Sequence, residues 1–213
     1  MPVYTSDALI LRTYKLGESD RIVVFLTRDR GKKRGVAKNA RQSRRRFGAG
    51  LEPLTYGRVG YIERERRELV SLHYVEVLRS PLSAVDGEAL GYVSYFAELI
   101  DEWAPDADPN ETLFRLGVSM VEAIAAGVPI QPLARYFEYW VLRLQGVYEP
   151  DPRVSAEAQA FLAAARTCSP FTLGDVKVSA QVLQELEASH RALIAMHLEK
   201  DLKSARVLRE MRK

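Results

Sequence analysis

The period of the hydrophobic pattern changes at Ser80-Pro81, and this change constrains the fold of the 213-residue chain more than any other feature. From Tyr4 to Leu78, apolar and polar residues alternate in short runs that glycines interrupt, as β-strands require. After residue 80, apolar residues recur every three or four positions, which is the period of amphipathic helices. The sequence therefore predicts an α+β protein with two domains, residues 1–80 and 81–213, which pack against each other because no low-complexity linker separates them.

Five short strands fit the first domain. Three are expected within residues 8–36, a fourth in the run from 51 to 65 and a fifth in the run from 68 to 80. Gly57 and Gly60 interrupt the fourth run, and glycine inside a strand often marks a bulge or a barrel corner. Five strands with one strong bend favour a five-stranded OB-type β-barrel, and a small β-sandwich is the alternative.

The second domain is predicted to be all-helical and to bind partner proteins. Asn110 and Ser155 are expected to cap helix N-termini, and Gly127 is expected to end a helix. The helices are expected at about residues 84–103, 110–126, 132–144, 155–166, 179–196 and 198–211.

Charge divides the chain in the same place. Residues 1–80 hold 18 Lys and Arg against 9 Asp and Glu, whereas residues 81–213 hold 13 against 19. The strongest concentration runs from Arg28 to Arg46, where glycines keep the backbone adaptable. A solvated mobile loop is the plain alternative, but so dense a positive charge indicates contact with nucleic-acid phosphates. The predicted contact residues are Arg28, Arg30, Lys32, Lys33, Arg34, Lys38, Arg41, Arg44, Arg45, Arg46 and the aromatic Tyr56.

Aromatic rings in the first domain offer surfaces on which bases could stack. A tyrosine on a strand is more often a core or rim residue, so each ring has this second interpretation. The candidates are Tyr14, Phe47, Tyr56, Tyr61 and Tyr74. Four further arginines could extend the basic surface, but three glutamates alternate with them, which is also typical of a solvated strand edge. These residues are Arg58, Arg64, Arg66 and Arg67, with Glu63, Glu65 and Glu68.

No catalytic motif stands out, and the chain is predicted not to be an enzyme. Glu187, His190 and His197 share one helix face, but a di-iron site would need a second pair of this kind, so a solvated face is expected instead. The single cysteine, Cys168, excludes an internal disulfide and a multi-cysteine zinc site. No apolar run approaches the roughly 18 residues of a membrane span, and a cytoplasmic protein without membrane contact or cofactor is expected.

One helix of the second domain places aromatic and basic residues side by side. Arg135, Tyr139 and Arg143 recur at intervals of four, so they are predicted to share a face. An acidic peptide with an apolar end could dock there through ion pairs and a pocket. Packing of Phe137 and Trp140 in the core explains the opposite face without a ligand.

The order of motifs resembles the RecO family of bacterial recombination mediators over nearly the whole chain. The N-terminal match is ALILRTYKLGESDRIVVFLTRDRGKKRGVAKNARQSRRRFGAGLEPLTYGRV, with an acidic Glu-Ser-Asp turn, a strand that ends in threonine, a glycine turn and a basic Ala-Lys-x-Ala-Arg stretch. Further matches are FEYWVLRLQGVYEPDP and the C-terminal KDLKSARVLREM.

The resemblance implies an OB-type barrel before a helical domain and a role as a DNA repair and recombination mediator. It implies binding of single- and double-stranded DNA, annealing of complementary strands and, with RecR, help in loading RecA on DNA coated by single-strand-binding protein. The implied protein partners are RecR, the acidic C-terminal tail of single-strand-binding protein and the RecA pathway. Many members carry a four-cysteine zinc insertion after the segment that corresponds to Pro150, but this chain has only Cys168, so no bound zinc is expected.

Two other function classes fit the residues. An RNA-binding OB-fold protein of ribosome or tRNA metabolism would use the same barrel and basic loop, since no residue identifies a reader of the 2′-hydroxyl. A protein-only interaction scaffold would use the loop to dock an acidic partner, and it would bind oligonucleotides negligibly at moderate salt.

Overall fold

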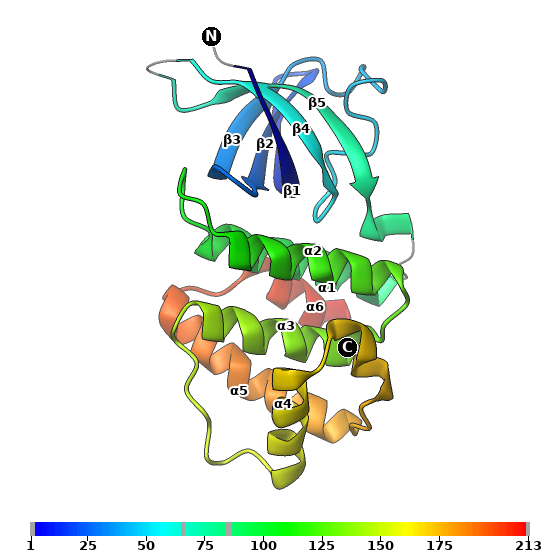
Figure 1. Ribbon diagram of the computed structural model, residues 1–213, viewed down its shortest axis with the longest axis vertical. Coiled ribbons are helices and arrows are strands. Elements are labelled where there is room, and N and C mark those ends of the chain that lie inside the picture. The colour runs from blue at the N-terminus through cyan, green and yellow to red at the C-terminus, as the bar shows by residue number, and fades with distance from the viewer. Residues whose placement is uncertain (1–2, 65–66, 84–86, 212–213) are drawn as a thin grey trace.

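The computed structural model describes residues 3–64, 67–83 and 87–211 and shows a β-barrel stacked on a helical region (Figure 1). The strands are β1 (Val3–Leu16), β2 (Asp20–Thr27), β3 (Gly31–Ala37), β4 (Tyr56–Ile62) and β5 (Val70–Arg79). A short 3₁₀ turn at Pro81–Ser83 follows the last strand. The helices are α1 (Gly87–Trp103), α2 (Glu111–Ala125), α3 (Ile130–Leu144), α4 (Ala156–Thr167), α5 (Ala180–Leu198) and α6 (Lys203–Met211).

The five strands close into a barrel in the order β1-β2-β3-β5-β4, and β4 pairs with β1 to complete the ring. All neighbours are antiparallel except β3 and β5, which run parallel over three residue pairs. The OB-type barrel is thus confirmed over the sandwich. The register between β4 and β5 shifts at Gly57 and again after Gly60, which confirms the expected irregularities at these glycines.

Both faces of β1 are buried at residues 8–11, and both faces of β2 are buried at residues 23–26. Ile10 and Phe25 point into the barrel with Tyr61 of β4 and are fully buried. Leu9 and Leu26 point outward and belong to the same core as the helices. This double burial explains why these two segments are continuously apolar rather than alternating.

A glycine on α2 lets the barrel approach the helices closely. A Cβ atom at Gly117 would lie 2.5 Å from Leu9 Cδ1 and 3.0 Å from Ile100 Cδ1. Leu9 therefore fills the space that any larger residue on α2 would occupy.

The helical region is organised around α3, whose residues 132–139 are all buried. Asn110 and Ser155 accept hydrogen bonds from the backbone N–H groups of Leu113 and Ala158, so both predicted caps are present. The expected last helix starts late, at Lys203, because Glu199 adopts a left-handed conformation with φ of 52° and ends α5. The start expected at residue 84 lies outside the described residues. A 3₁₀ segment at Pro170–Asp175 was not anticipated. No helix among the described residues is long and apolar enough to cross a membrane.

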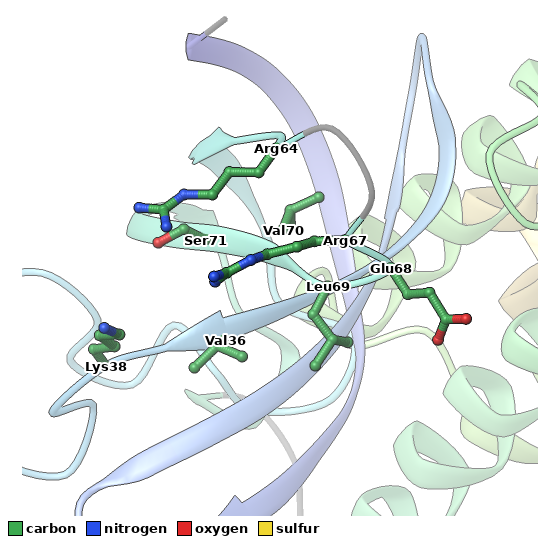
Figure 2. A pocket seen from close by; sticks show the side chains of 8 residues that line it. All are labelled: Val36, Lys38, Arg64, Arg67, Glu68, Leu69, Val70 and Ser71. Atoms are coloured by element: carbon green, nitrogen blue, oxygen red, sulfur yellow. The ribbon is translucent and has the colours of Figure 1, made fainter. Parts of the chain in front are cut away.

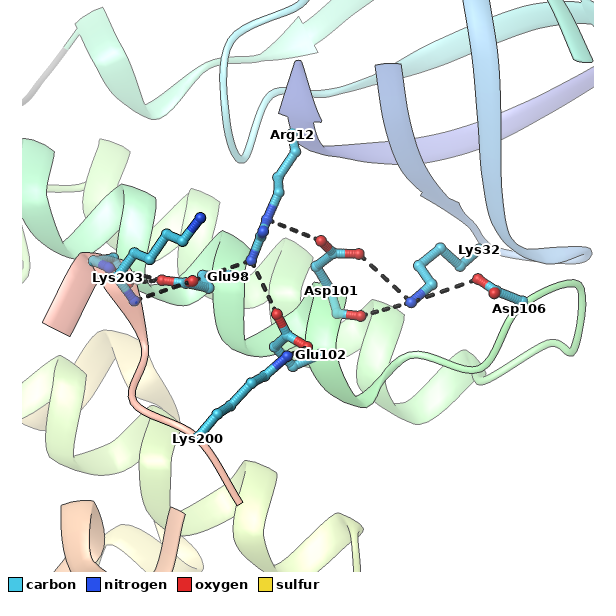
Figure 3. A network of polar contacts seen from close by, with 9 residues as sticks. Arg12, Lys32, Glu98, Asp101, Glu102, Asp106, Lys200 and Lys203 are labelled. Carbon is cyan, nitrogen blue, oxygen red and sulfur yellow. Dashed lines mark hydrogen bonds and ion pairs between the residues drawn. The ribbon is translucent and has the colours of Figure 1, made fainter. Parts of the chain in front are cut away.

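An ion-pair cluster joins the barrel to the helices (Figure 3). Arg12 of β1 lies within 3.2 Å of carboxylate oxygens of Glu98, Asp101 and Glu102, all on α1. Glu98 also accepts hydrogen bonds from the backbone N–H groups of Lys203 and Ser204 at the start of α6. The cluster therefore connects the barrel, α1 and α6.

Candidate nucleic-acid interface

The fold divides the basic segment 28–46 into three parts with different surroundings. Residues 28–30 form the turn between β2 and β3, residues 31–37 form β3, and residues 38–46 begin the connection to β4. Only part of the predicted set is accessible for contact with a polyanion.

In the β2–β3 turn, each arginine has a neighbour inside the protein. Arg28 Nη2 lies 2.8 Å from Glu111 Oε1 of α2, in an ion pair that is more than half exposed. The Arg30 guanidinium carbon lies 3.9 Å from the centre of the Tyr4 ring, a cation–π contact. Both side chains remain at the surface, but part of their charge is already compensated.

Lys32 corrects the expectation of a uniformly exposed run. Its side chain is 9% exposed, and its Nζ donates a 2.7 Å hydrogen bond to the carbonyl oxygen of Asp101. Carboxylate oxygens of Asp101 and Asp106 lie 3.5 Å from the same Nζ (Figure 3). Lys32 therefore joins the barrel to the helices, and we leave it out of the interface.

Along β3, alternation separates the remaining cations. Lys33 is paired with Glu63 of the β4–β5 connection at 2.7 Å, and its side chain is only 16% exposed. Arg34 is exposed and lines a pocket of about 510 Å³ that also contains Arg64 and Arg67. Arg34 is thus the accessible cation of this strand.

The β3–β4 connection is a folded structure, not the free loop of the alternative interpretation. The backbone N–H of Asn39 donates to Asp20 Oδ1 at 2.8 Å, and the N–H of Val75 on β5 donates to the carbonyl of Arg46 at 2.9 Å. The Phe47 ring is 2% exposed and belongs to the barrel core. These anchors fix the backbone that carries the arginines.

Arg46 has a structural role within this connection. Its Nη2 donates to the carbonyl of Lys38 at 2.7 Å, and its Nε donates to Ser43 Oγ at 2.8 Å. By contrast, Lys38, Arg44 and Arg45 are exposed. Their positive charge is directed to solvent, and of the residues that can be described, no acidic side chain lies within ion-pair distance of any of the three.

A surface groove of about 580 Å³ collects the basic side chains of the connection. Arg41 and Arg44 line it together with Arg21 of β2, and Leu51 and Pro53 contribute apolar surface. Arg41 is exposed, and one of its guanidinium nitrogens donates to the carbonyl of Glu18 at 3.1 Å. Arg21 was missed at the sequence level because it lies outside the dense run, and only its pairing opposite Ala37 brings it close.

The aromatic candidates prove mostly structural. Phe47 and Tyr61 are in the barrel core, so the prediction of stacking was wrong for both, and burial raises the pKa of Tyr61 to about 12. Tyr56 packs edge-on against Phe114 of α2 with ring centres 6.2 Å apart. Tyr74 is half-buried, and Tyr14 is 45% exposed. Tyr14 is therefore the most accessible ring of the five.

The predicted peptide site on α3 is largely inside the protein. Arg135 is 1% exposed, and its Nη2 lies 3.0 Å from Oε1 of the equally buried Glu138. Tyr139 is 4% exposed, and its hydroxyl accepts a 2.8 Å hydrogen bond from the exposed Arg143. Periodicity assigned a solvent face to α3, but neighbouring elements cover both of its faces, so only Arg143 could meet a peptide.

The histidine face of α5 also differs from expectation. His190 is 1% exposed, and its Nδ1 lies 3.1 Å from Glu138 Oε2, so it is a buried partner and not part of a solvated face. Glu138 also accepts a hydrogen bond from Tyr95, whose pKa is raised well above 10 mainly by burial. Over residues 3–64, 67–83 and 87–211, no group of three or more His, Cys, Asp or Glu side chains could hold a metal ion. The absence of bound zinc stays a prediction.

Comparisons with known proteins agree with this architecture. Residues 1–81 match the family model "Recombination protein O N terminal", and residues 84–151 match "Recombination protein O C terminal". The DNA repair protein RecO of Koribacter versatilis is 46% identical over 147 residues, which cover 68% of this chain and 59% of the relative. The chain thus matches somewhat more than half the length of this relative.

A second relative is matched over more of its length. The DNA repair protein RecO of Pelotomaculum thermopropionicum is 30% identical over 201 residues, which cover 88% of this chain and 77% of the relative. The two family matches lie in the order of the barrel and the helices, and the chain belongs to the RecO family.

Proposed function

We propose that this protein acts in DNA repair by binding single-stranded DNA along the basic groove of its barrel. The observation that carries the proposal is the groove of about 580 Å³, where Arg21, Arg41 and Arg44 converge on a backbone that is already folded. A preformed array of cations loses little conformational entropy when phosphates bind, and it releases counterions from the strand. The names of the relatives supply the repair context.

Annealing follows from the same electrostatics. Cations that neutralise phosphates lower the repulsion between two complementary strands, and contacts to the backbone without base selection allow the strands to exchange register. We therefore include duplex DNA among the ligands. The protein acts as a mediator and not as an enzyme in this scheme.

The helical region is proposed to serve the protein partners that the family resemblance implies. These are RecR, the acidic C-terminal tail of single-strand-binding protein, and the RecA pathway, in which the protein would help to load RecA on DNA. Because Arg135 is enclosed, an acidic tail would meet the exposed Arg143 first. Two measurements test the alternatives. An RNA-binding protein would prefer RNA over DNA in a competition at equal salt. A protein-only scaffold would bind oligonucleotides negligibly at moderate salt.

The experiment is a salt series of single-stranded DNA binding with a charge-matched control. The test variant changes Arg41, Arg44 and Arg45 to alanine, and the control changes Arg166, Lys177 and Arg206, which are exposed residues of the helical region. For single strands, each lost phosphate contact changes the logarithmic salt slope by about 0.7, so the test variant should be flatter by roughly 2 units. The control should retain the native slope.

Equal slopes for the native protein and the test variant would remove the groove from the binding site. A flatter salt slope in both variants would show that the net charge of the protein, and not the groove, determines the affinity for single-stranded DNA.

A further inference from the structure

A third pocket lies on the outer surface of the barrel beside the contact of β3 with β5, and it shares Arg64 and Arg67 with the pocket at Arg34. It has a volume of about 380 Å³, and the side chains of Val36 and Leu69 form its apolar floor, whereas Val70, also in its lining, belongs to the barrel core (Figure 2). Lys38, Arg64 and Arg67 are at its rim. The sequence left two interpretations for Arg64 and Arg67, an extension of the basic surface and a solvated strand edge, and Arg66 and Glu65 between them lie outside the described residues.

The pocket exists because β3 and β5 pair over a very short distance. Their parallel contact covers Gly35–Ala37 and Val70–Leu72 only. A Cβ at Gly35 would come within 3.0 Å of Val70 Cγ2, so the glycine allows the two strands to meet. Val36 lies opposite Ser71 in this register, and alternation turns both outward while their neighbours Ala37 and Leu72 are buried. Apolar surface is thereby left open beside the contact.

The rim carries a net positive charge, because three cations and one carboxylate, Glu68, line the pocket. Within the described parts of the chain, no carboxylate lies within ion-pair distance of Lys38, Arg64 or Arg67. Glu63 is engaged with Lys33, and the Glu68 side chain points away from the two arginines (Figure 2). Cations around an apolar floor suit a ligand that combines an anion with an apolar group.

A nucleotide has this combination. Its base is apolar on both faces and can lie on aliphatic side chains and guanidinium planes, and its phosphates can meet the flanking cations. The volume lies within the range of about 300–1,000 Å³ that is usual for small-ligand pockets. Lys38 at the rim and Arg41 in the basic groove are three residues apart on the β3–β4 connection, so one DNA strand can contact both.

We propose that this pocket holds one unpaired nucleotide of a DNA strand, with its base against Val36 and Leu69 and its neighbouring phosphates at Lys38, Arg64 and Arg67. The proposal rests on the proposed function, because it requires that the barrel binds single strands. It adds a preference for unpaired DNA, since a base inside a duplex cannot enter without leaving its stack. During annealing, the captured base must leave the pocket before it can pair.

The test compares two oligonucleotides of equal length and charge, oligothymidylate and an oligomer of abasic deoxyribose phosphates. The native protein should bind oligothymidylate about tenfold more tightly, as expected for one contacted base. Leu69→Ser should reduce this preference severalfold and leave the affinity for the abasic oligomer unchanged. Leu90→Ser, at a leucine of α1 that is 47% exposed, serves as the matched control and should retain the preference.

Val36→Thr is a nearly isosteric second variant in case Leu69→Ser does not fold, and it should also reduce the preference. Arg64→Ala with Arg67→Ala should flatten the salt slope by about 1.4 units for both oligomers, since two phosphate contacts are lost. The salt slope thus reports the phosphate contacts of the rim, whereas the preference for oligothymidylate reports the base contact of the floor.

The outcomes distinguish the two proposals. Failure of the native protein to bind either oligomer overturns the proposed function and the pocket together. Binding without base preference, or a preference that both floor variants retain, overturns the pocket alone. Competition by an acidic apolar peptide, without any base preference, assigns the pocket to a protein ligand and also overturns it.

Discussion

Arg12 on β1 and Asp101 on α1 face each other across the junction between barrel and helices, with 2.9 Å between Arg12 Nε and Asp101 Oδ2. The same guanidinium reaches Glu98 and Glu102, so one cation of the barrel is paired with three carboxylates of α1. Position in the fold, more than position in the sequence, decides which cations of the barrel are accessible to an external ligand.

The Arg12 cluster should matter for stability. We expect Arg12→Met to lower the free energy of unfolding by roughly 1–3 kcal/mol, less than the roughly 3–5 kcal/mol of fully buried pairs because water reaches part of the cluster. Arg28→Met, which removes the exposed pair with Glu111 at the same junction, should leave the free energy of unfolding nearly unchanged. Urea unfolding of both variants checks the difference, and equal losses would contradict it.

Glu98 should make the docking of α6 sensitive to acid. Burial alone would raise its pKa, but hydrogen bonds from Ser204 and from the Lys203 N–H, together with Arg12, outweigh burial and lower the pKa below 4.5. A lowered pKa in the folded state contributes stability above about pH 4.5, and this contribution is lost as the pH falls further. Glu98→Gln should therefore lose less stability than the native protein between about pH 5.5 and pH 3.5 in urea titrations. Parallel pH profiles would refute this assignment.

Lys32 should separate stability from DNA binding. Lys32→Met removes a hydrogen bond from a buried ammonium, which should cost roughly 1–3 kcal/mol of unfolding free energy. The salt slope of DNA binding should stay at its native value. Arg45→Met should behave in the opposite way, with native stability and a slope flatter by about 0.7. A flattened slope for Lys32→Met would return this residue to the interface.

Gly31 should tolerate substitution worse than Gly17. Both have positive φ, of 66° and 59°, so alanine strains the backbone at either site. At Gly31, a Cβ would also lie 2.4 Å from the backbone nitrogen of Asp108, whereas nothing lies within 4 Å at Gly17. We expect Gly31→Ala to cost at least about 1 kcal/mol more than Gly17→Ala, because the backbone of the α1–α2 connection must move. Thermal unfolding of the two variants measures the difference.

Arg135 and Arg143 should give different results in peptide binding. Arg135→Met leaves Glu138 buried without its cation and should destabilise the fold by roughly 3–5 kcal/mol. Arg143→Met should leave stability nearly unchanged and weaken the binding of an acidic peptide. Calorimetric titration with an acidic peptide checks this, and native affinity in a folded Arg143→Met variant would exclude Arg143 as a contact.

Much of the fold was predictable because local patterns and tertiary packing agree. Alternation in residues 4–78 predicted the strands, and the glycines at 57 and 60 predicted the irregular pairing of β4 with β5. The five expected strands and the family resemblance both indicated a barrel ahead of a helical region. The capping residues Asn110 and Ser155 marked helix starts correctly because capping is a local interaction.

The site was less predictable because charge in sequence does not reveal burial. Lys32 and Arg34 are two residues apart, yet one is enclosed by α1 and the other is exposed. Arg135 has the spacing of a surface residue, but the packing of other elements over α3 buries it. The pocket beside Leu69 depends on where the pairing of β3 with β5 ends. The hydrophobic pattern of a strand does not indicate which other strand it pairs with, so this pocket could not be predicted.

The shared core has a mechanical consequence. Leu9 rests against Gly117 and lies in the same core as the helices, so tilting the barrel would pull apolar side chains into water. A partner bound to the helices would therefore move the barrel with them, so the groove proposed for DNA keeps its orientation relative to the helical region.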